Sequence, residues 1–113
     1  MAYDEFLEER IIRRLNEIHV SFKAKKMMGG LVFMVEEKMC FGIVKNQMMA
    51  RISPNLYSES LLKEGCNEMN FTGRAMTGFV FLDPEAIDMD EDLEYWLQVC
   101  LDFNPFAKKS KKK

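Results

Sequence analysis

The sequence is poor in the residues that build disulfide frameworks, metal sites and nucleophilic catalysts. It has three cysteines, an odd number with no Cys-x-x-Cys spacing, and a single histidine, His19. Because scattered, unpaired cysteines are typical of a reducing compartment, we expect free thiols and a cytoplasmic protein. No second ligand or triad partner accompanies His19, so the sequence favours a capping or surface role for it.

Long hydrophobic runs are absent as well. None approaches the roughly 20 residues that span a bilayer, and the acidic start Met1–Glu5 does not resemble a signal peptide. Gly29-Gly30 is followed by no Gly-Lys-Ser/Thr, which excludes a phosphate-binding loop. The acidic run 88–92 lacks the ligand order of a calcium loop. We therefore expect no membrane association, no metal site and no cofactor.

Charge is distributed unevenly along the chain. Five of the 16 basic residues lie in the last six positions, so residues 1–107 carry the remaining 11 against 18 acidic ones, a formal charge of −7. Such an acidic body is poorly suited to wrapping nucleic acid, although the basic tail can still contact an anionic partner. We expect one domain over residues 1–107 and a disordered, lysine-rich tail over 108–113.

What the sequence does contain is a series of short apolar runs. They cover residues 31–35, 39–44, 48–52 and 78–82 and are rich in Val, Ile, Phe and Met. Their length favours strands over helices, and the short connections between the first three predict an antiparallel meander. The alternating segment 20–26 predicts an extended edge with its lysines outward, and 69–72 predicts one more short strand.

Three helices are predicted beside these strands. The first covers Tyr3–Ile18, the second begins at Ser53-Pro54 with a hydroxyl cap, and the third begins near Asp90 and ends at Asn104-Pro105. The residues expected on their buried sides include Leu56, Leu61 and Leu62 in the second helix and Leu93, Trp96, Leu97, Cys100 and Leu101 in the third. The predicted fold class is α+β, an antiparallel sheet of about four to six strands packed with three helices.

The strands carry one further inference. Residues 31–35 and 79–82 are apolar at every position, whereas a half-exposed antiparallel strand alternates apolar and polar residues. Both faces of the sheet are therefore expected to be covered. Either the three helices divide between the two faces, or a second copy of the chain covers one face in a homodimer.

Several short motifs occur in a characteristic order: Met27-Met28-Gly29-Gly30, Gly42-Ile43-Val44, Met48-Met49-Ala50-Arg51, Met69–Arg74, Met76–Val80 and Asp83-Pro84. In this order they resemble the N-terminal domain of the TfoX/Sxy family, bacterial regulators of natural competence, over most of the chain. The resemblance implies helices on an antiparallel sheet, similar to a secretion-chaperone-like architecture. It also implies a stand-alone N-terminal domain without the family's C-terminal domain, and it transfers no catalytic residues.

Five basic residues form the predicted binding surface: Lys23, Lys25, Lys26, Arg51 and Arg74. Both arginines match family positions at strand ends, where a planar guanidinium suits bidentate recognition of a carboxylate or phosphate. The alternative is an intramolecular pair with Asp83 or a neighbouring carboxylate. The lysines either extend a basic strip beside the arginines or form an ordinary solvated edge.

Sulfur-containing residues allow two interpretations. Cys40 and Cys100 are expected to be small buried residues, and Cys66 the exposed thiol, with a pKa raised by its neighbours Glu64 and Glu68. Among the methionines, Met34, Met39 and Met48 are expected in the core. Met27, Met28, Met76 and Met89, nearer to turns, are candidates for a surface patch.

These patterns favour a non-enzymatic binding or regulatory module that acts through contacts with an unidentified protein, with a homodimer as one form of that contact. The alternative is a weak nucleic-acid-binding protein that uses the basic tail with Lys23, Lys25, Lys26 and Arg74, and whose affinity falls steeply with salt. A small enzyme or ligand carrier built on Cys66 or on an arginine-lined pocket is the third hypothesis.

Overall fold

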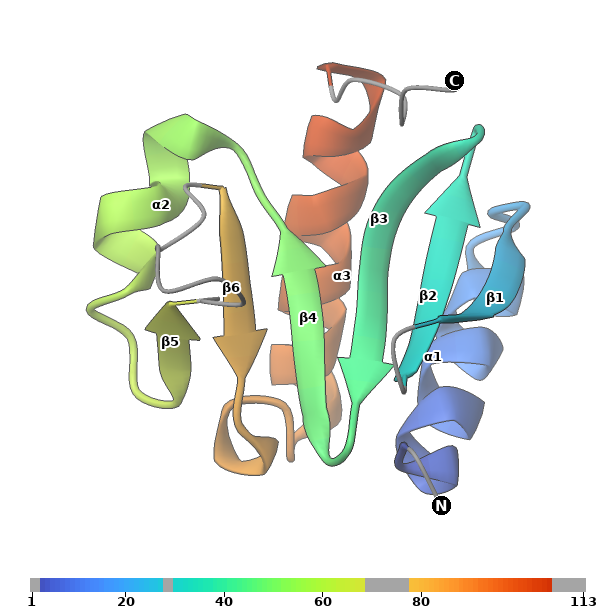
Figure 1. Cartoon of the computed structure of the whole chain (residues 1–113), viewed down its shortest axis with the longest axis horizontal. Coiled ribbons are helices and arrows are strands. Elements are labelled where there is room, and N and C mark those ends of the chain that lie inside the picture. The colour runs from blue at the N-terminus through green and yellow to red at the C-terminus, as the bar shows by residue number, and fades with distance from the viewer. Residues whose placement is uncertain (1–2, 28–29, 69–77, 107–113) are drawn as a thin grey trace.

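The computed structural model describes residues 3–27, 30–68 and 78–106. These residues form a six-stranded antiparallel sheet in the order β1-β2-β3-β4-β6-β5 (Figure 1). The strands are β1 Lys23–Met27, β2 Gly30–Val35, β3 Lys38–Val44, β4 Gln47–Arg51, β5 Cys66–Glu68 and β6 Phe79–Leu82. The predicted antiparallel α+β fold is confirmed. The strand expected at 69–72 lies outside the described residues, and β5 precedes it.

The second and third helices begin where the sequence predicts, whereas the first begins two residues later than expected, at Glu5. The helices are α1 Glu5–Glu17, α2 Pro54–Ser60 and α3 Asp90–Phe103, with short 3-10 turns η1 Pro84–Ala86 and η2 Asn104–Phe106. Ser53 caps α2, its hydroxyl accepting the Asn55 N–H at 3.2 Å. The predicted burial of Leu62 is wrong, because α2 ends at Ser60 and leaves this side chain 87% exposed in the turn beyond. No helix in the described ranges is long and apolar enough to cross a membrane.

All three helices contribute to one hydrophobic core on one face of the sheet. Figure 1 shows α1 and α3 behind the strands, and α2 beside β5 and β6. The core includes Leu7, Ile11 and Leu15 of α1, Tyr57 of α2, Leu93, Trp96, Leu97 and Cys100 of α3, and Phe33, Phe41, Ile43, Met48 and Val80 of the sheet. Of the two alternatives, the division of the helices between both faces is therefore wrong for the described residues. Each helix has one apolar stripe, and the large strand side chains that match these stripes all point to the same side.

His19 ends α1 in a left-handed backbone conformation. Its φ is 60°, its N–H donates to the Asn16 carbonyl at 3.2 Å, and the following Val20 N–H donates to the Leu15 carbonyl at 2.9 Å. This pair of bonds is the Schellman arrangement, which normally places glycine where His19 stands. The predicted capping role of His19 is confirmed, and it is carried by the backbone.

Replacing this residue with glycine tests the backbone strain. We expect His19→Gly to raise the free energy of unfolding by about 1 kcal/mol, because a Cβ in the left-handed region costs roughly that much. The measurement is urea-induced unfolding followed by circular dichroism. His19→Ala is the matched control, since it removes the imidazole but keeps the Cβ, and it should leave the stability nearly unchanged. Equal stability of the Gly and Ala variants would contradict a strained, left-handed backbone at His19.

Candidate functional site

The sheet face opposite the helices carries a second hydrophobic cluster made only of strand residues. We call this surface the open face, and it consists of Val32, Met34, Met39, Met49, Phe79 and Phe81 with the flanking cations Lys23, Lys25 and Arg51. Val32 and Met49 are 8% and 4% exposed, and the other four apolar residues are partly buried. No described helix contributes to this cluster, so within the described ranges it is made of strand residues alone.

Alternation along β2 explains why the run 31–35 is apolar throughout. Leu31, Phe33 and Val35 enter the helical core, whereas Val32 and Met34 belong to the open face. The strand therefore presents hydrophobic side chains to both faces, as its sequence predicts. The same division holds in β6, where Val80 and Leu82 face the helices.

One row of the open face crosses the whole sheet. In the strand register Lys25 lies opposite Val32, Val32 opposite Gly42, Gly42 opposite Met49, Met49 opposite Phe81, and Phe81 opposite Asn67. Directly opposed residues of antiparallel strands point to the same side. The row therefore has a cation at its β1 end, an apolar middle and an amide at its β5 end.

Gly42 sits at the centre of this row for a steric reason. A Cβ at this position would lie 2.6 Å from the Leu31 carbonyl oxygen and 3.2 Å from the terminal methyl of Met49. The Met49 side chain thus lies over the bare backbone of β3, next to Val32. This close packing accounts for the low exposure of Met49 and Val32 on a face that no described helix covers.

Arg51 lies on the open face and packs against an aromatic ring. Its Cζ is 5.4 Å from the centroid of the Phe79 ring, and its Nη1 donates to the Met39 carbonyl at 3.4 Å. Burial lowers the pKa of the Arg51 guanidinium, which remains a cation at neutral pH. The alternative pairing with Asp83 does not form, because Arg51 is opposite Phe79 at the start of β6 while Asp83 follows its end. Asp83 instead accepts from Gln47 at 2.7 Å.

The structure brings together some of the predicted basic residues and separates others. Lys23 is opposite Met34 and Lys25 is opposite Val32, so both flank the open face. Lys26 is opposite Leu31, a residue of the helical core, and therefore lies on the other side of the sheet. Arg74 lies outside the described residues. A continuous basic strip is thus not formed by the three lysines.

The apolar members of the open face were not predicted as a surface. Met34 and Met39, expected in the core, belong to this face, whereas Met48 is fully buried in the core as predicted. Met89 is 57% exposed as expected, but it precedes α3, away from the sheet cluster. Met28, Met76 and the Met27 side chain lie outside the described residues. The sequence did contain a signal for this surface. Counting alternate positions from Phe33 along its strand separates the residues of the two sheet faces.

None of the cysteines is poised as a nucleophile. Cys40 and Cys100 are each 1% exposed, as predicted, but Cys66 is only 7% exposed, so its predicted exposure is wrong. Cys66 begins β5 opposite Leu82 and points into the core. Burial raises the pKa of Cys66 to about 11, with Lys63 lowering it and Asp83 adding to the rise. Burial likewise raises the pKa of Cys40 to about 12.

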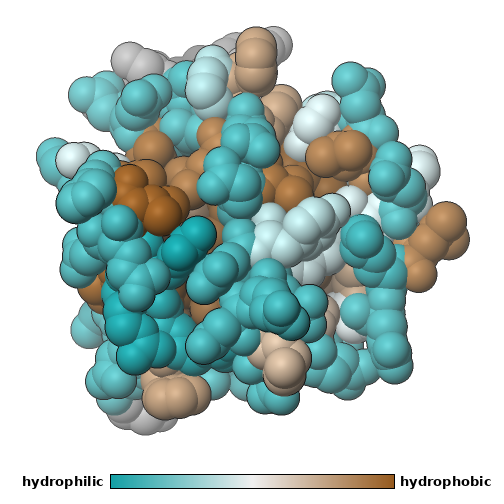
Figure 2. Space-filling view, turned by 180° about the vertical axis from the view of Figure 1, so that it is seen from behind, coloured by the Kyte–Doolittle hydropathy of each residue, from teal (hydrophilic) through white to brown (hydrophobic). Residues whose placement is uncertain are grey.

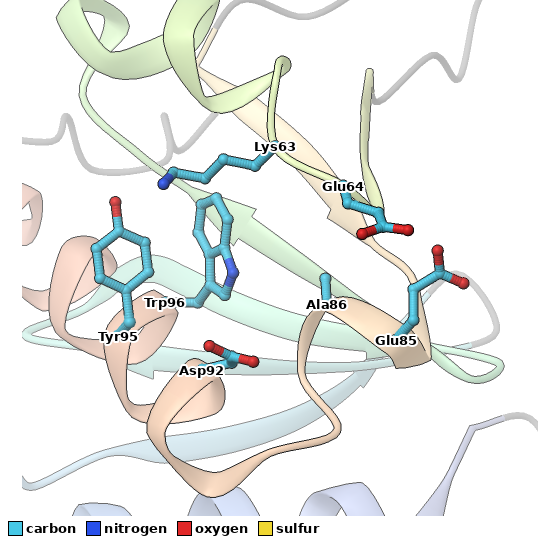
Figure 3. Close-up of a pocket in the computed structure, with 7 residues that line it drawn as sticks. All are labelled: Lys63, Glu64, Glu85, Ala86, Asp92, Tyr95 and Trp96. Atoms are coloured by element: carbon cyan, nitrogen blue, oxygen red, sulfur yellow. The ribbon is translucent and has the colours of Figure 1, made fainter.

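No metal centre appears in the described part of the chain. It contains no group of three or more His, Cys, Asp or Glu side chains placed to hold a metal ion. One cleft, lined by residues of the α2–β5 connection, η1 and α3, includes neither Arg51 nor Cys66 (Figure 3). The open face is therefore the surface that gathers most of the described residues predicted to function.

Comparison with known proteins gives one match. Residues 15–104 match the family model described as the TfoX N-terminal domain. The matched range starts in α1, ends at the first residue of η2 and contains all six strands. No curated protein and no solved structure matches the chain. The match thus covers every residue that forms the open face.

Thiol reactivity tests the burial of the cysteines. At about pH 8, a thiol with the pKa of Cys66 has about a hundredfold less thiolate than a free cysteine of pKa 9.0. We expect all three thiols of the folded protein to react with a chromogenic disulfide reagent at least about a hundredfold more slowly than in the guanidinium-unfolded chain. The unfolded control should release three equivalents. If one equivalent reacted at the free-thiol rate in the folded protein, one cysteine would be exposed, which would contradict the burial of all three.

Proposed function

Because the chain belongs to the TfoX N-terminal domain family, a family of regulatory, competence-related modules, we propose that it acts by binding another protein through the open face. In this proposal the domain catalyses no reaction and works in the cytoplasm, where its three free, buried thiols stay reduced. The observation that carries the proposal is the second hydrophobic cluster, which no described helix covers.

The composition of the open face fits a protein interface. Its centre is apolar, with Met and Phe side chains, and its flanks are cationic, which is the usual division between an interface core and its rim. Methionines adapt their shape to a partner, and aromatic and arginine residues are enriched at binding hot spots. Completing the burial of Met34, Met39, Phe79 and Phe81 would contribute on the order of 1 kcal/mol each.

Nucleic acid is the second candidate partner, because Lys23, Lys25 and Arg51 share the open face with Phe79. Two observations favour a protein instead. A base could stack on this side of Phe79 only by displacing the guanidinium that already lies 5.4 Å from the ring centroid. The acidic body of the chain also repels a polyanion.

A polar substitution on the open face tests the proposal. We expect the double variant Met34→Gln/Met39→Gln to lose specific protein partners in affinity capture from the organism that encodes the chain, measured by quantitative mass spectrometry. Each change replaces an apolar contact by a polar one of similar length, so the affinity for a purified partner should fall about tenfold per site.

The matched control is Glu9→Gln/Arg13→Gln on the exposed side of α1, which also leaves the net charge unchanged. It should retain the partners, and both double variants should remain folded by circular dichroism. Recovery of the same proteins with both variants, or of none with the wild type, would contradict binding through the open face. Sedimentation velocity of the same proteins identifies a second copy as the partner if only the methionine variant becomes monomeric.

A further inference from the structure

A cleft on the helical side of the molecule has no role in the proposal above. It has a volume of about 730 Å³ and is lined by Lys63, Glu64, Glu85, Ala86, Asp92, Tyr95 and Trp96. Figure 2 shows this helical side of the molecule as largely hydrophilic, with separate hydrophobic patches. The volume is within the roughly 300–1,000 Å³ that small-molecule and cofactor sites commonly occupy.

The local backbone brings two carboxylates together at one end of this cleft. Gly65, with φ of 81°, packs against η1 so closely that a Cβ would lie 2.9 Å from the Ala86 Cβ and 3.1 Å from the Glu85 Cγ. Its carbonyl also accepts the Asp83 N–H at 2.8 Å, which fixes the two connections side by side. Figure 3 shows the carboxylates of Glu64 and Glu85 facing each other there.

These carboxylates are not neutralised within the described chain. The ion pairs found there join Arg10 to Asp90, and Arg14 to Glu17 and Glu94, so none involves Glu64, Glu85 or Asp92. The one cation in the lining, Lys63, has its Nζ 5.1 Å from the centroid of the Tyr95 ring. Figure 3 shows that its ammonium lies toward the aromatic end and away from the two glutamates. The cleft therefore has an excess of negative charge at its glutamate end.

Trp96 supplies an independent sign of a ligand. The residue is only 3% exposed and its side chain is part of the core, yet its indole N–H has no acceptor among the described residues. In Figure 3 the indole nitrogen lies on the side of the ring that faces Ala86, inside the cleft. A donor held there by core packing is available to an acceptor that enters the cleft and displaces water from it.

We propose that this cleft binds a basic peptide segment of a partner protein, with an arginine side chain between Glu64 and Glu85 and a main-chain carbonyl accepting from the Trp96 N–H. The described residues contain no group of three or more His, Cys, Asp or Glu side chains placed to hold a metal ion. A guanidinium is planar and carries several donors, so it can pair with two separate carboxylates. A peptide also provides a carbonyl that can accept from the indole N–H.

Trp96 is the only tryptophan of the chain, so its fluorescence reports directly on the cleft. The probe is a capped alanine pentapeptide with a central arginine, titrated into the full chain at low salt. We expect saturable quenching or a spectral shift with Kd below about 1 mM, confirmed by calorimetry. The same peptide with a central glutamine should bind at least about tenfold more weakly, because it lacks the charge that pairs with the glutamates.

Comparing two double variants distinguishes binding in the cleft from a general effect of the protein's net charge. Glu64→Gln/Glu85→Gln should abolish the preference for arginine, whereas Glu9→Gln/Glu59→Gln, with the same change in net charge at exposed positions outside the cleft, should retain it. Trp96→Phe keeps an aromatic ring but removes the donor, and calorimetry should show an affinity about three- to tenfold lower.

Three results would overturn the proposal. They are equal binding of the arginine and glutamine peptides, equal loss in both double-glutamate variants, and binding that appears only after removal of residues 108–113. The last result would make the lysine-rich end of the chain the occupant of the cleft. None of these outcomes bears on the open face, because the two surfaces share no residue.

Discussion

The structure depends on one mismatch: the sheet is hydrophobic on both faces, but the described helices cover only one. The side-chain period of a strand sends successive residues to opposite sides, so Leu31 and Phe33 enter the helical core while Val32 and Met34 do not. A monomeric α+β domain with one solvated face would place polar residues at the second set of positions. Their apolar character is therefore not required by the helical core, and it supports an interface as the role of the open face.

The open face is also better organised than a set of exposed hydrophobic side chains. Gly42 lets the Met49 side chain lie over the β3 backbone, and Arg51 packs on the Phe79 ring while donating to the Met39 carbonyl. These contacts lower the exposed apolar area of the free domain and hold the surface in one shape. A preorganised surface loses less conformational entropy on binding, so the same contacts serve both solubility and affinity.

Much of the fold could be predicted from local patterns, because they depend on neighbours in the sequence. The apolar runs, the Ser53-Pro54 start of α2 and the Asn104-Pro105 end of α3 are all found as expected. The errors concern what local patterns do not encode. Leu62 was assigned to a helix that ends two residues earlier, and Cys66 looked exposed beside Gly65 although strand pairing with β6 turns it inward.

The candidate site was predicted in part for the same reason. The sequence identified Arg51 and the lysines by their charge, but only the strand register shows that Lys23 and Lys25 flank the open face while Lys26 does not. The apolar stripes of the three helices look alike in sequence. Which face of the sheet each helix covers is therefore decided only by tertiary packing. The even–odd alternation from Phe33 would have identified Val32 and Met34, yet the side that stays free of helices follows only from the assembled fold.

The charged residues of this acidic chain are distributed unevenly over its surface. The open face carries Lys23, Lys25 and Arg51, whereas the cleft on the helical side carries Glu64, Glu85 and Asp92. The body thus carries two local surfaces of opposite sign, separated by the sheet and the helical layer. Because exposed charges act mainly within about 10 Å at moderate salt, each surface selects its partner by its own local field. The overall charge therefore disfavours a polyanion, whereas the local charge of each surface selects among other partners.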